Sequence, residues 1–104
     1  NDERITKLEQ MQKELTIREI KDKRSSMKGW SCIEDKLKKS FLFDNYRDAM
    51  SFIVRLSYEA DGQNHHPEVF NCYNRVEILL NTHDAGGKVT KKDFDLALAI
   101  DAIC

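Results

Sequence analysis

Length, composition and charge exclude several classes of protein at the outset. The chain has 104 residues, a formal net charge of −1 and a single proline; 40% of its residues are hydrophobic and 34% are charged. This balance is typical of one compact soluble domain. It provides neither the basic surface that direct nucleic-acid binding needs nor an apolar run approaching the roughly 20 residues that cross a membrane.

The cysteines and the first residues of the chain indicate the cellular compartment in which the protein is expected. Cys32, Cys72 and Cys104 form an odd set at wide spacing, which favours free thiols over a disulfide framework. The chain opens without a basic start followed by an apolar run, so no secretory signal is expected. Together these features predict a cytoplasmic protein.

The N-terminal quarter is rich in charge. Apolar residues at mostly helical spacing between positions 4 and 28 predict two short helices, and Thr16 followed by Glu19 has the pattern of a capping box. We expect residues 1–15 to be an N-terminal extension, helical or frayed, and residues 16–104 to be the domain itself.

Two strands and a long helix are predicted next. Residues 30–43 alternate loosely and end in three apolar residues, with Glu34-Asp35 as the turn between two half-buried strands. Asp44 is expected to cap a helix that begins near Asn45. Its apolar residues return to one face at steps of three and four: Ala49, Phe52, Ile53, Leu56 and Ala60.

The remainder predicts a hairpin and a closing helix. Residues 69–73 and 76–80 have strand character and are separated by Asn74-Arg75 as a two-residue turn. Thr90 and Asp93 have the spacing of a second capping box, ahead of an apolar helix that runs to the end. The expected fold class is α+β: a four-stranded antiparallel sheet with three helices on one face, in the order helix-strand-strand-helix-strand-strand-helix.

The three histidines of the chain, His65, His66 and His83, fall within nineteen positions. If Asn74 and Arg75 are the loop, facing positions sum to 149, and His66 lies opposite His83 at about 5 Å between Cβ atoms. Asp61 precedes His65 by four residues and can orient its imidazole if the helix extends that far. The candidate binding residues of the two segments are Asn64, His65, His66, Asn81, Thr82, His83 and Asp84.

Paired imidazoles can supply a general acid and a general base, because histidine changes protonation near neutral pH. The residues alone leave two other interpretations open. One is a polar loop without a catalytic role. The other is a metal site, which is disfavoured because neither CxxC nor HxxxH spacing is present.

The arrangement of an acidic residue, three residues, then His-His-Pro-Glu stands here as Asp61 and His65-His66-Pro67-Glu68. Further matching positions are Gly29-Trp30, the stretch 41–52, Phe70-Asn71, Tyr73-Asn74, Thr82-His83-Asp84 and Gly86-Gly87. By these residues, which extend from about 16 to 104, the chain resembles the pterin-4a-carbinolamine dehydratases, also known as dimerisation cofactors of a homeodomain transcription factor. It departs from the family at Val69, where tryptophan is usual, and at Asp61, where glutamate is frequent.

The resemblance implies a hydro-lyase that removes water from 4a-hydroxytetrahydrobiopterin to give quinonoid dihydropterin, in tetrahydrobiopterin recycling, with neither a cofactor nor a metal. It implies the same α+β fold, assembled into homodimers or homotetramers. In this interpretation His65, oriented by Asp61, and His83 act as acid and base, while His66 holds the pyrimidine edge of the ring. Trp30 is a weaker candidate for stacking on the pterin, since a lone tryptophan is more often a core residue.

Two further expectations follow from the resemblance. Asp93 matches an acidic position of the family pattern, but its place three residues after Thr90 makes helix capping the expected role. Some members bind a dimeric transcription factor through a helical surface. A protein-interaction module is therefore the second function class, with the nucleus as a second location, and it would not depend on the three histidines.

Overall fold

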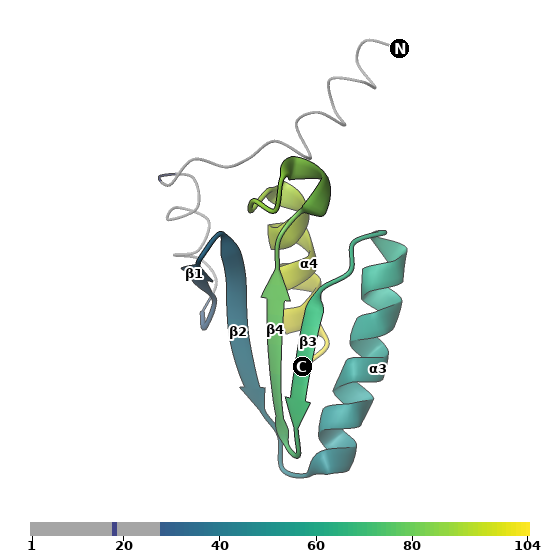
Figure 1. Cartoon of the computed structure of the whole chain (residues 1–104). Helices are drawn as coiled ribbons and strands as arrows, with labels where there is room; N and C mark the ends of the chain where they lie inside the picture. Colours follow the sequence, from purple (N-terminus) through teal and green to yellow (C-terminus); the bar gives the residue numbers. More distant parts are fainter. Residues whose placement is uncertain (1–17, 19–27) are drawn as a thin grey trace.

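The structure is a computed structural model that describes Arg18 and residues 28–104 (Figure 1). The elements follow in the order β1 (Ser31–Ile33), β2 (Lys36–Leu42), α3 (Tyr46–Gly62), β3 (Glu68–Cys72), β4 (Arg75–Leu80), the 3-10 turn η1 (His83–Ala85) and α4 (Lys91–Ala102). From residue 30 onward this is the predicted order. The helices expected between residues 4 and 28, and the Thr16 capping box, lie outside the described residues, so the fold seen here is α+β with two α-helices.

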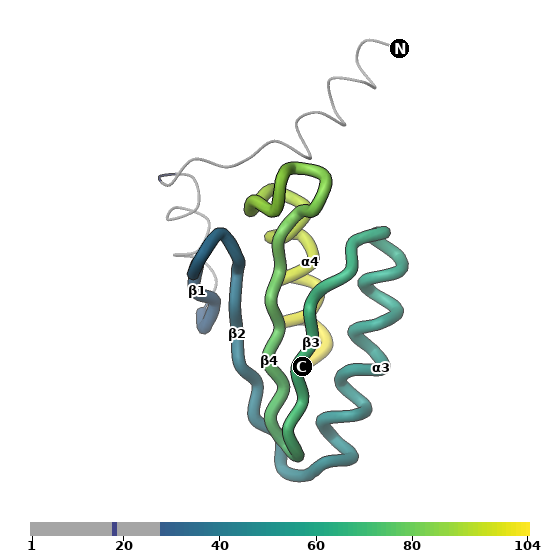
Figure 2. The backbone as a smooth tube through the Cα atoms, in the orientation of Figure 1, coloured from purple at the N-terminus to yellow at the C-terminus, as the bar shows by residue number. Residues whose placement is uncertain are grey.

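The four strands form one antiparallel sheet in the order β1-β2-β4-β3, which places β4 between β2 and β3 (Figure 2). The turn between β1 and β2 falls at Glu34-Asp35, as predicted. Both residues have positive φ, 51° and 62°. Such angles suit a tight hairpin turn, since their twist matches that of the flanking strands.

One face of the sheet carries the hydrophobic core. Leu37 pairs with Leu80 and Phe41 with Val76, so the side chains of these residues share a face with that of Ile78. All five are buried, and they cluster with Phe52 and Leu56 of α3 and with Phe94 and Ile100 of α4. Both described helices therefore cover the same face of the sheet, in agreement with the predicted layering.

Helix α3 begins at Tyr46, one residue later than predicted. Asn45, rather than Asp44, is the N-cap: its backbone is extended and its side-chain oxygen accepts a hydrogen bond from the Asp48 N–H at 2.8 Å. The apolar face is as predicted, with Ala49, Phe52, Leu56 and Ala60 buried and Ile53 partly buried. No helix in the described part of the chain is both long enough and apolar enough to cross a membrane.

The β3–β4 turn is Tyr73-Asn74, and the prediction of Asn74-Arg75 was wrong. Cys72 pairs with Arg75, so facing positions sum to 147 and not 149. Asn74 is held in the turn because its side-chain amide donates to the Phe43 carbonyl at 2.8 Å while its own carbonyl accepts from the Phe43 N–H at 2.8 Å. The two-residue shift preserves which face each side chain occupies, but His66 no longer lies opposite His83.

Helix α4 is tied to the rest of the domain at both ends. At its start the predicted capping box is present, with Thr90 as N-cap and Asp93 as its partner. In its last turn, the Asp101 carboxylate accepts hydrogen bonds from Trp30 Nε1 at 3.0 Å and from Lys39 Nζ at 2.7 Å. The helix is thus anchored to the first strands of the sheet as well as to the loops beside β4.

Candidate active site

The end of α3 places two adjacent histidines in different environments. After the C-cap Gln63, Asn64 adopts a left-handed conformation with φ of 49°, which asparagine tolerates better than most residues. The His65 N–H donates to the Ala60 carbonyl at 3.0 Å, which closes the turn. As a result the His65 side chain is buried, whereas that of His66 is exposed.

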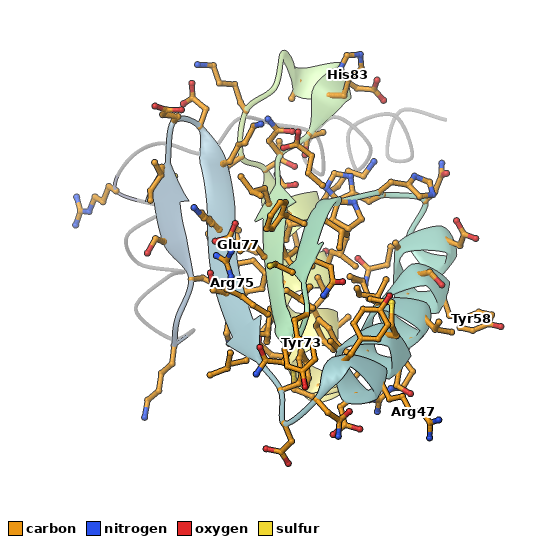
Figure 3. The ribbon with its side chains drawn as sticks, turned by 60° about the horizontal axis from the view of Figure 1, so that its bottom comes forward. Arg47, Tyr58, Tyr73, Arg75, Glu77 and His83 are labelled. Carbon is orange, nitrogen blue, oxygen red and sulfur yellow. The ribbon has the colours of Figure 1, made fainter. Side chains whose placement is uncertain are left out.

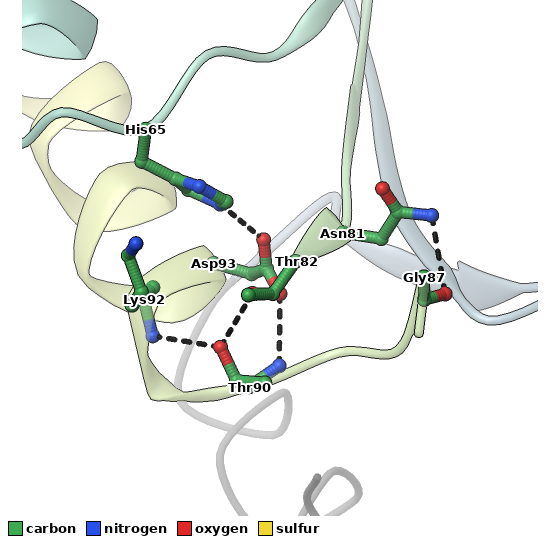
Figure 4. Close-up of polar contacts among 7 residues, drawn as sticks. All are labelled: His65, Asn81, Thr82, Gly87, Thr90, Lys92 and Asp93. Carbon is green, nitrogen blue, oxygen red and sulfur yellow. Dashed lines mark hydrogen bonds and ion pairs between the residues drawn. The ribbon is translucent and has the colours of Figure 1, made fainter. Parts of the chain in front are cut away.

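The buried histidine contacts Asp93, on the first turn of α4 (Figure 4). His65 Nε2 lies 2.5 Å from Asp93 Oδ1. The other carboxylate oxygen accepts from the Thr82 hydroxyl at 3.0 Å and from the Thr90 N–H at 2.8 Å. Because the Thr82 proton is used on Asp93, the Thr90 hydroxyl is the donor in the 2.6 Å contact between the two threonines. Asp93 is therefore held in place by three groups.

This network corrects the expected partner of His65. Asp61 does not reach His65: its carboxylate contacts His66 Nε2 at 2.9 Å, on the surface. The helical i,i+4 relation fails because the chain leaves the helix at Gln63, before His65. Asp93, expected only to cap a helix, performs that function and also contacts the buried imidazole. Its match to an acidic position of the family pattern was the signal that pointed to this second role.

His83, the third histidine, lies in a loop whose two ends, near residues 81–82 and 87–88, are hydrogen-bonded to each other. Thr82 pairs with Lys88 in an isolated bridge, and the Asn81 side-chain amide donates to the Gly87 carbonyl at 3.2 Å. Within this loop His83 begins the 3-10 turn η1 and is exposed. Figure 3 shows His83 at the end of the domain opposite Tyr73, so the histidine end and the β3–β4 turn are far apart.

The two segments meet around one pocket of about 250 Å³. Its lining contains every histidine of the chain together with polar residues from both segments: Asn64, His65, His66, Asn81, Thr82, His83, Asp84 and Lys92. The segments 64–66 and 81–84 are thus brought together as expected, although not through the expected register. They meet because the first segment precedes β3 and the second follows β4, at the same end of this antiparallel pair.

Two predicted site residues lie elsewhere. Asp61 is not part of the pocket lining: its carboxylate contacts His66, and its carbonyl accepts from the Asn64 N–H at 3.1 Å. Trp30 is 4% exposed and packs edge-on against Phe41, with ring centroids 6.2 Å apart, so it occupies the core and does not line the pocket. Lys92, which lines the pocket, was not among the predicted residues.

Metal ligation was the competing interpretation of the histidines. Within residues 28–104 and at Arg18, no group of three or more His, Cys, Asp and Glu side chains is arranged to hold a metal ion. Asp93 and Asp61 each engage one histidine nitrogen. Two of the three imidazoles in the pocket are therefore each engaged by a carboxylate.

Comparison with known proteins identifies the family. A family model described as pterin 4 alpha carbinolamine dehydratase matches residues 13–103. The chain belongs to the pterin-4a-carbinolamine dehydratase family. Proteins named as pterin-4-alpha-carbinolamine dehydratases are similar to it over most of their length. The one from Opitutus terrae is 48% identical over 86% of this chain and 92% of its own. The one from Sulfurisphaera tokodaii is 43% identical over 88% and 97%.

The family fold is seen in a solved relative. The crystal structure of a transcriptional coactivator/pterin dehydratase from Brucella melitensis superposes with a TM-score of 0.83 and is 32% identical in sequence. The similarity covers 88% of this chain and 98% of that one. The sheet and its two described helices therefore belong to a fold shared with this solved relative.

Proposed function

We propose that this chain removes water from 4a-hydroxytetrahydrobiopterin to form quinonoid dihydropterin, as a step of tetrahydrobiopterin recycling. The observation that carries the proposal is the meeting of all three histidines around one pocket, with His65 held by the buried carboxylate of Asp93. Family membership supports the same reaction.

The reaction needs one proton acceptor and one proton donor. The bond between the ring carbon and the hydroxyl oxygen breaks and water leaves, while the neighbouring ring nitrogen loses its proton and forms a double bond to that carbon. No electron is transferred. Two imidazoles in different protonation states can divide this work at neutral pH.

We assign the base to His65 and the acid to His83. An ionised carboxylate only accepts hydrogen bonds, so the contact with Asp93 places the proton of neutral His65 on Nε2 and leaves Nδ1 free to accept one. The Asp93 carboxylate also stabilises the imidazolium that forms when the proton arrives. His83 has no carboxylate on its ring among the described residues, and its exposed position lets it exchange protons with water.

The remaining pocket residues are assigned to binding. His66 is paired with exposed Asp61 and is suited to holding the pyrimidine edge of the ring. The carboxylate of Asp84 can accept from ring N–H and amino groups. Asn64, Asn81 and Thr82 complete the polar lining.

A direct assay tests the proposal. Purified chain should accelerate the dehydration of enzymatically generated 4a-hydroxytetrahydropterin, and both His65→Gln and His83→Ala should lower kcat by about 10² to 10⁴. Glutamine at 65 retains a donor for Asp93, and His83 is exposed, so both variants are expected to fold; circular dichroism checks this. A wild-type protein without acceleration, or folded variants with full kcat, would refute the assignment.

A second candidate function is a protein-interaction module, favoured by the outer side of α3. Tyr46, Val54 and Tyr58 are 50%, 55% and 75% exposed there, and Tyr58 points away from the sheet in Figure 3. We propose that this side joins copies of the chain into homodimers or homotetramers, or binds a transcription factor, as the coactivator name of the Brucella relative suggests. Sedimentation of the wild type and Val54→Asp tests self-association: the variant should be smaller, and equal sizes would refute it.

A further inference from the structure

Lys92 is a cationic side chain in the lining of the histidine pocket that has no role in the proposed reaction so far. Lys92 is half-buried, and its backbone N–H donates to the Thr90 hydroxyl at 3.2 Å. Its ammonium has no hydrogen bond or ion pair within the described part of the chain. Figure 4 shows its side chain extending from α4 on the side where the His65 ring lies.

The helix itself gives no reason for a lysine at this position. Lys92 is the second residue of α4, where the exposed N–H groups carry partial positive charge and a cation is unfavourable. The acid of this turn, Asp93, is directed inward to His65 and the two threonines. The preceding lysine, Lys91, is compensated by an ion pair of 2.8 Å with Asp95, whereas Lys92 is not.

Most other groups of the pocket are already engaged. His65 contacts Asp93, His66 contacts Asp61, and the Asn81 amide donates to Gly87. Lys92 adds three hydrogen-bond donors and no acceptor. It is therefore suited to an acceptor atom of the ligand, and among the residues that the structure describes it is the one Lys or Arg side chain in the lining of this pocket.

We propose that Lys92 donates a hydrogen bond to the ring carbonyl oxygen of the pterin and so fixes the orientation of the ring against the histidines. The inference rests on the proposed function and deepens it. The carbonyl is the exocyclic acceptor of the pyrimidine ring, beside the carbon that carries the leaving hydroxyl. Its neighbours on the ring are N–H and amino donors, for which the carboxylate of Asp84 is the complementary group in the same lining.

Lys92 acts in binding and not in proton transfer. The ring carbonyl is not one of the bonds that form or break in the dehydration, so its hydrogen bond with Lys92 is present both before and during the reaction. An interaction made equally in the ground state and the transition state lowers KM and leaves kcat unchanged. The role therefore has a kinetic signature distinct from that of His65 and His83.

The test is a ligand comparison in the full chain. Pterin and 2,4-diaminopteridine, in which an amino group replaces the ring carbonyl, are titrated by fluorescence against the wild type, Lys92→Met, Lys92→Arg and the matched control Lys91→Met. We expect Lys92→Met to reduce the preference for pterin about tenfold, the loss of roughly one hydrogen bond from a charged donor. Lys91→Met should keep the preference and Lys92→Arg should keep most of it.

Kinetics and stability complete the test. Lys92→Met should raise KM about tenfold with kcat within about twofold of wild type, and its thermal midpoint should be no lower than that of wild type. An unchanged ligand preference and KM, or a collapse of kcat at unchanged KM, would overturn the assignment of Lys92 while leaving the dehydratase proposal intact. A wild type that neither binds pterin nor accelerates dehydration overturns both.

Discussion

Two histidine–aspartate pairs stand side by side at the end of α3, and they differ in almost everything except residue type. The His65 and Asp93 side chains are 8% and 0% exposed, and the carboxylate also holds two threonines. The His66 and Asp61 side chains are 64% and 81% exposed, and no second hydrogen bond holds that carboxylate in the described structure. The His65–Asp93 pair is buried and held by further hydrogen bonds, whereas the His66–Asp61 pair is exposed to solvent.

The difference shows that burial, and not the pairing itself, decides what such a pair can do. A surface ion pair contributes about 0–1 kcal/mol, because water and salt screen it. Removing one partner of a buried pair leaves an uncompensated group, at a cost of about 3–5 kcal/mol. The buried pair can therefore fix the tautomer and orientation of its imidazole, and the exposed pair cannot.

The largest effect is expected from breaking the buried pair. Asp93→Ala should lower the free energy of unfolding by about 3–5 kcal/mol, since it removes the acceptor of His65, Thr82 and the Thr90 N–H together. Asp93→Asn keeps the size and should lose less stability, but its amide presents the wrong hydrogen-bonding group to His65 and activity should still fall. Urea unfolding measures the first effect. A loss below about 1 kcal/mol in Asp93→Ala would mean that the network is not structural.

An intermediate effect is expected from the residue that separates the two pairs. Asn64→Ala keeps the φ of 49° but removes the short polar side chain that lets asparagine tolerate this left-handed angle, and it should destabilise the domain by about 1 kcal/mol. Asn64→Gly accepts this angle freely and serves as the control. Thermal unfolding of both variants measures the difference. If alanine is as stable as glycine at this position, the left-handed turn does not set the different environments of His65 and His66.

The smallest effect is expected from the exposed pair. Asp61→Ala should change the free energy of unfolding by less than about 1 kcal/mol, and the difference from wild type should shrink as salt is added. Its effect should appear in KM rather than kcat, because His66 is assigned to binding. Urea unfolding at low and high salt makes the comparison. A stability loss equal to that of Asp93→Ala would remove the distinction between the two pairs.

Features that depend on residues close together in the sequence were predicted correctly, whereas contacts between distant residues were missed. The Thr90–Asp93 capping box, the Glu34-Asp35 turn and the apolar face of α3 are all relations within a few residues, and all were confirmed. Asp93 is 28 residues from His65, so no periodicity relates them. The choice of Asp61 as the partner of His65 assumed a helix that in fact ends before it.

The hairpin error has a similar cause. Asn74 and Arg75 form a plausible turn by composition, but the side chain of Asn74 is used by Phe43, which lies 31 residues earlier in the chain. This long-range contact moves the turn by one residue. The prediction that segments 64–66 and 81–84 come together did not depend on the exact register. It required only that the two strands pair as a hairpin, because one segment precedes the first strand and the other follows the second.

The anchoring of α4 at both ends has a consequence for how the protein can be handled. Rotation of this 12-residue helix about its axis would disturb Asp93 in the pocket and Asp101 against Trp30 and Lys39 at the same time. The orientation of the His65 imidazole is therefore set partly by the last turn of α4, at the far side of the domain. Bulk introduced at Cys104, three residues beyond that anchor, is therefore expected to disturb the pocket at the other end of the helix.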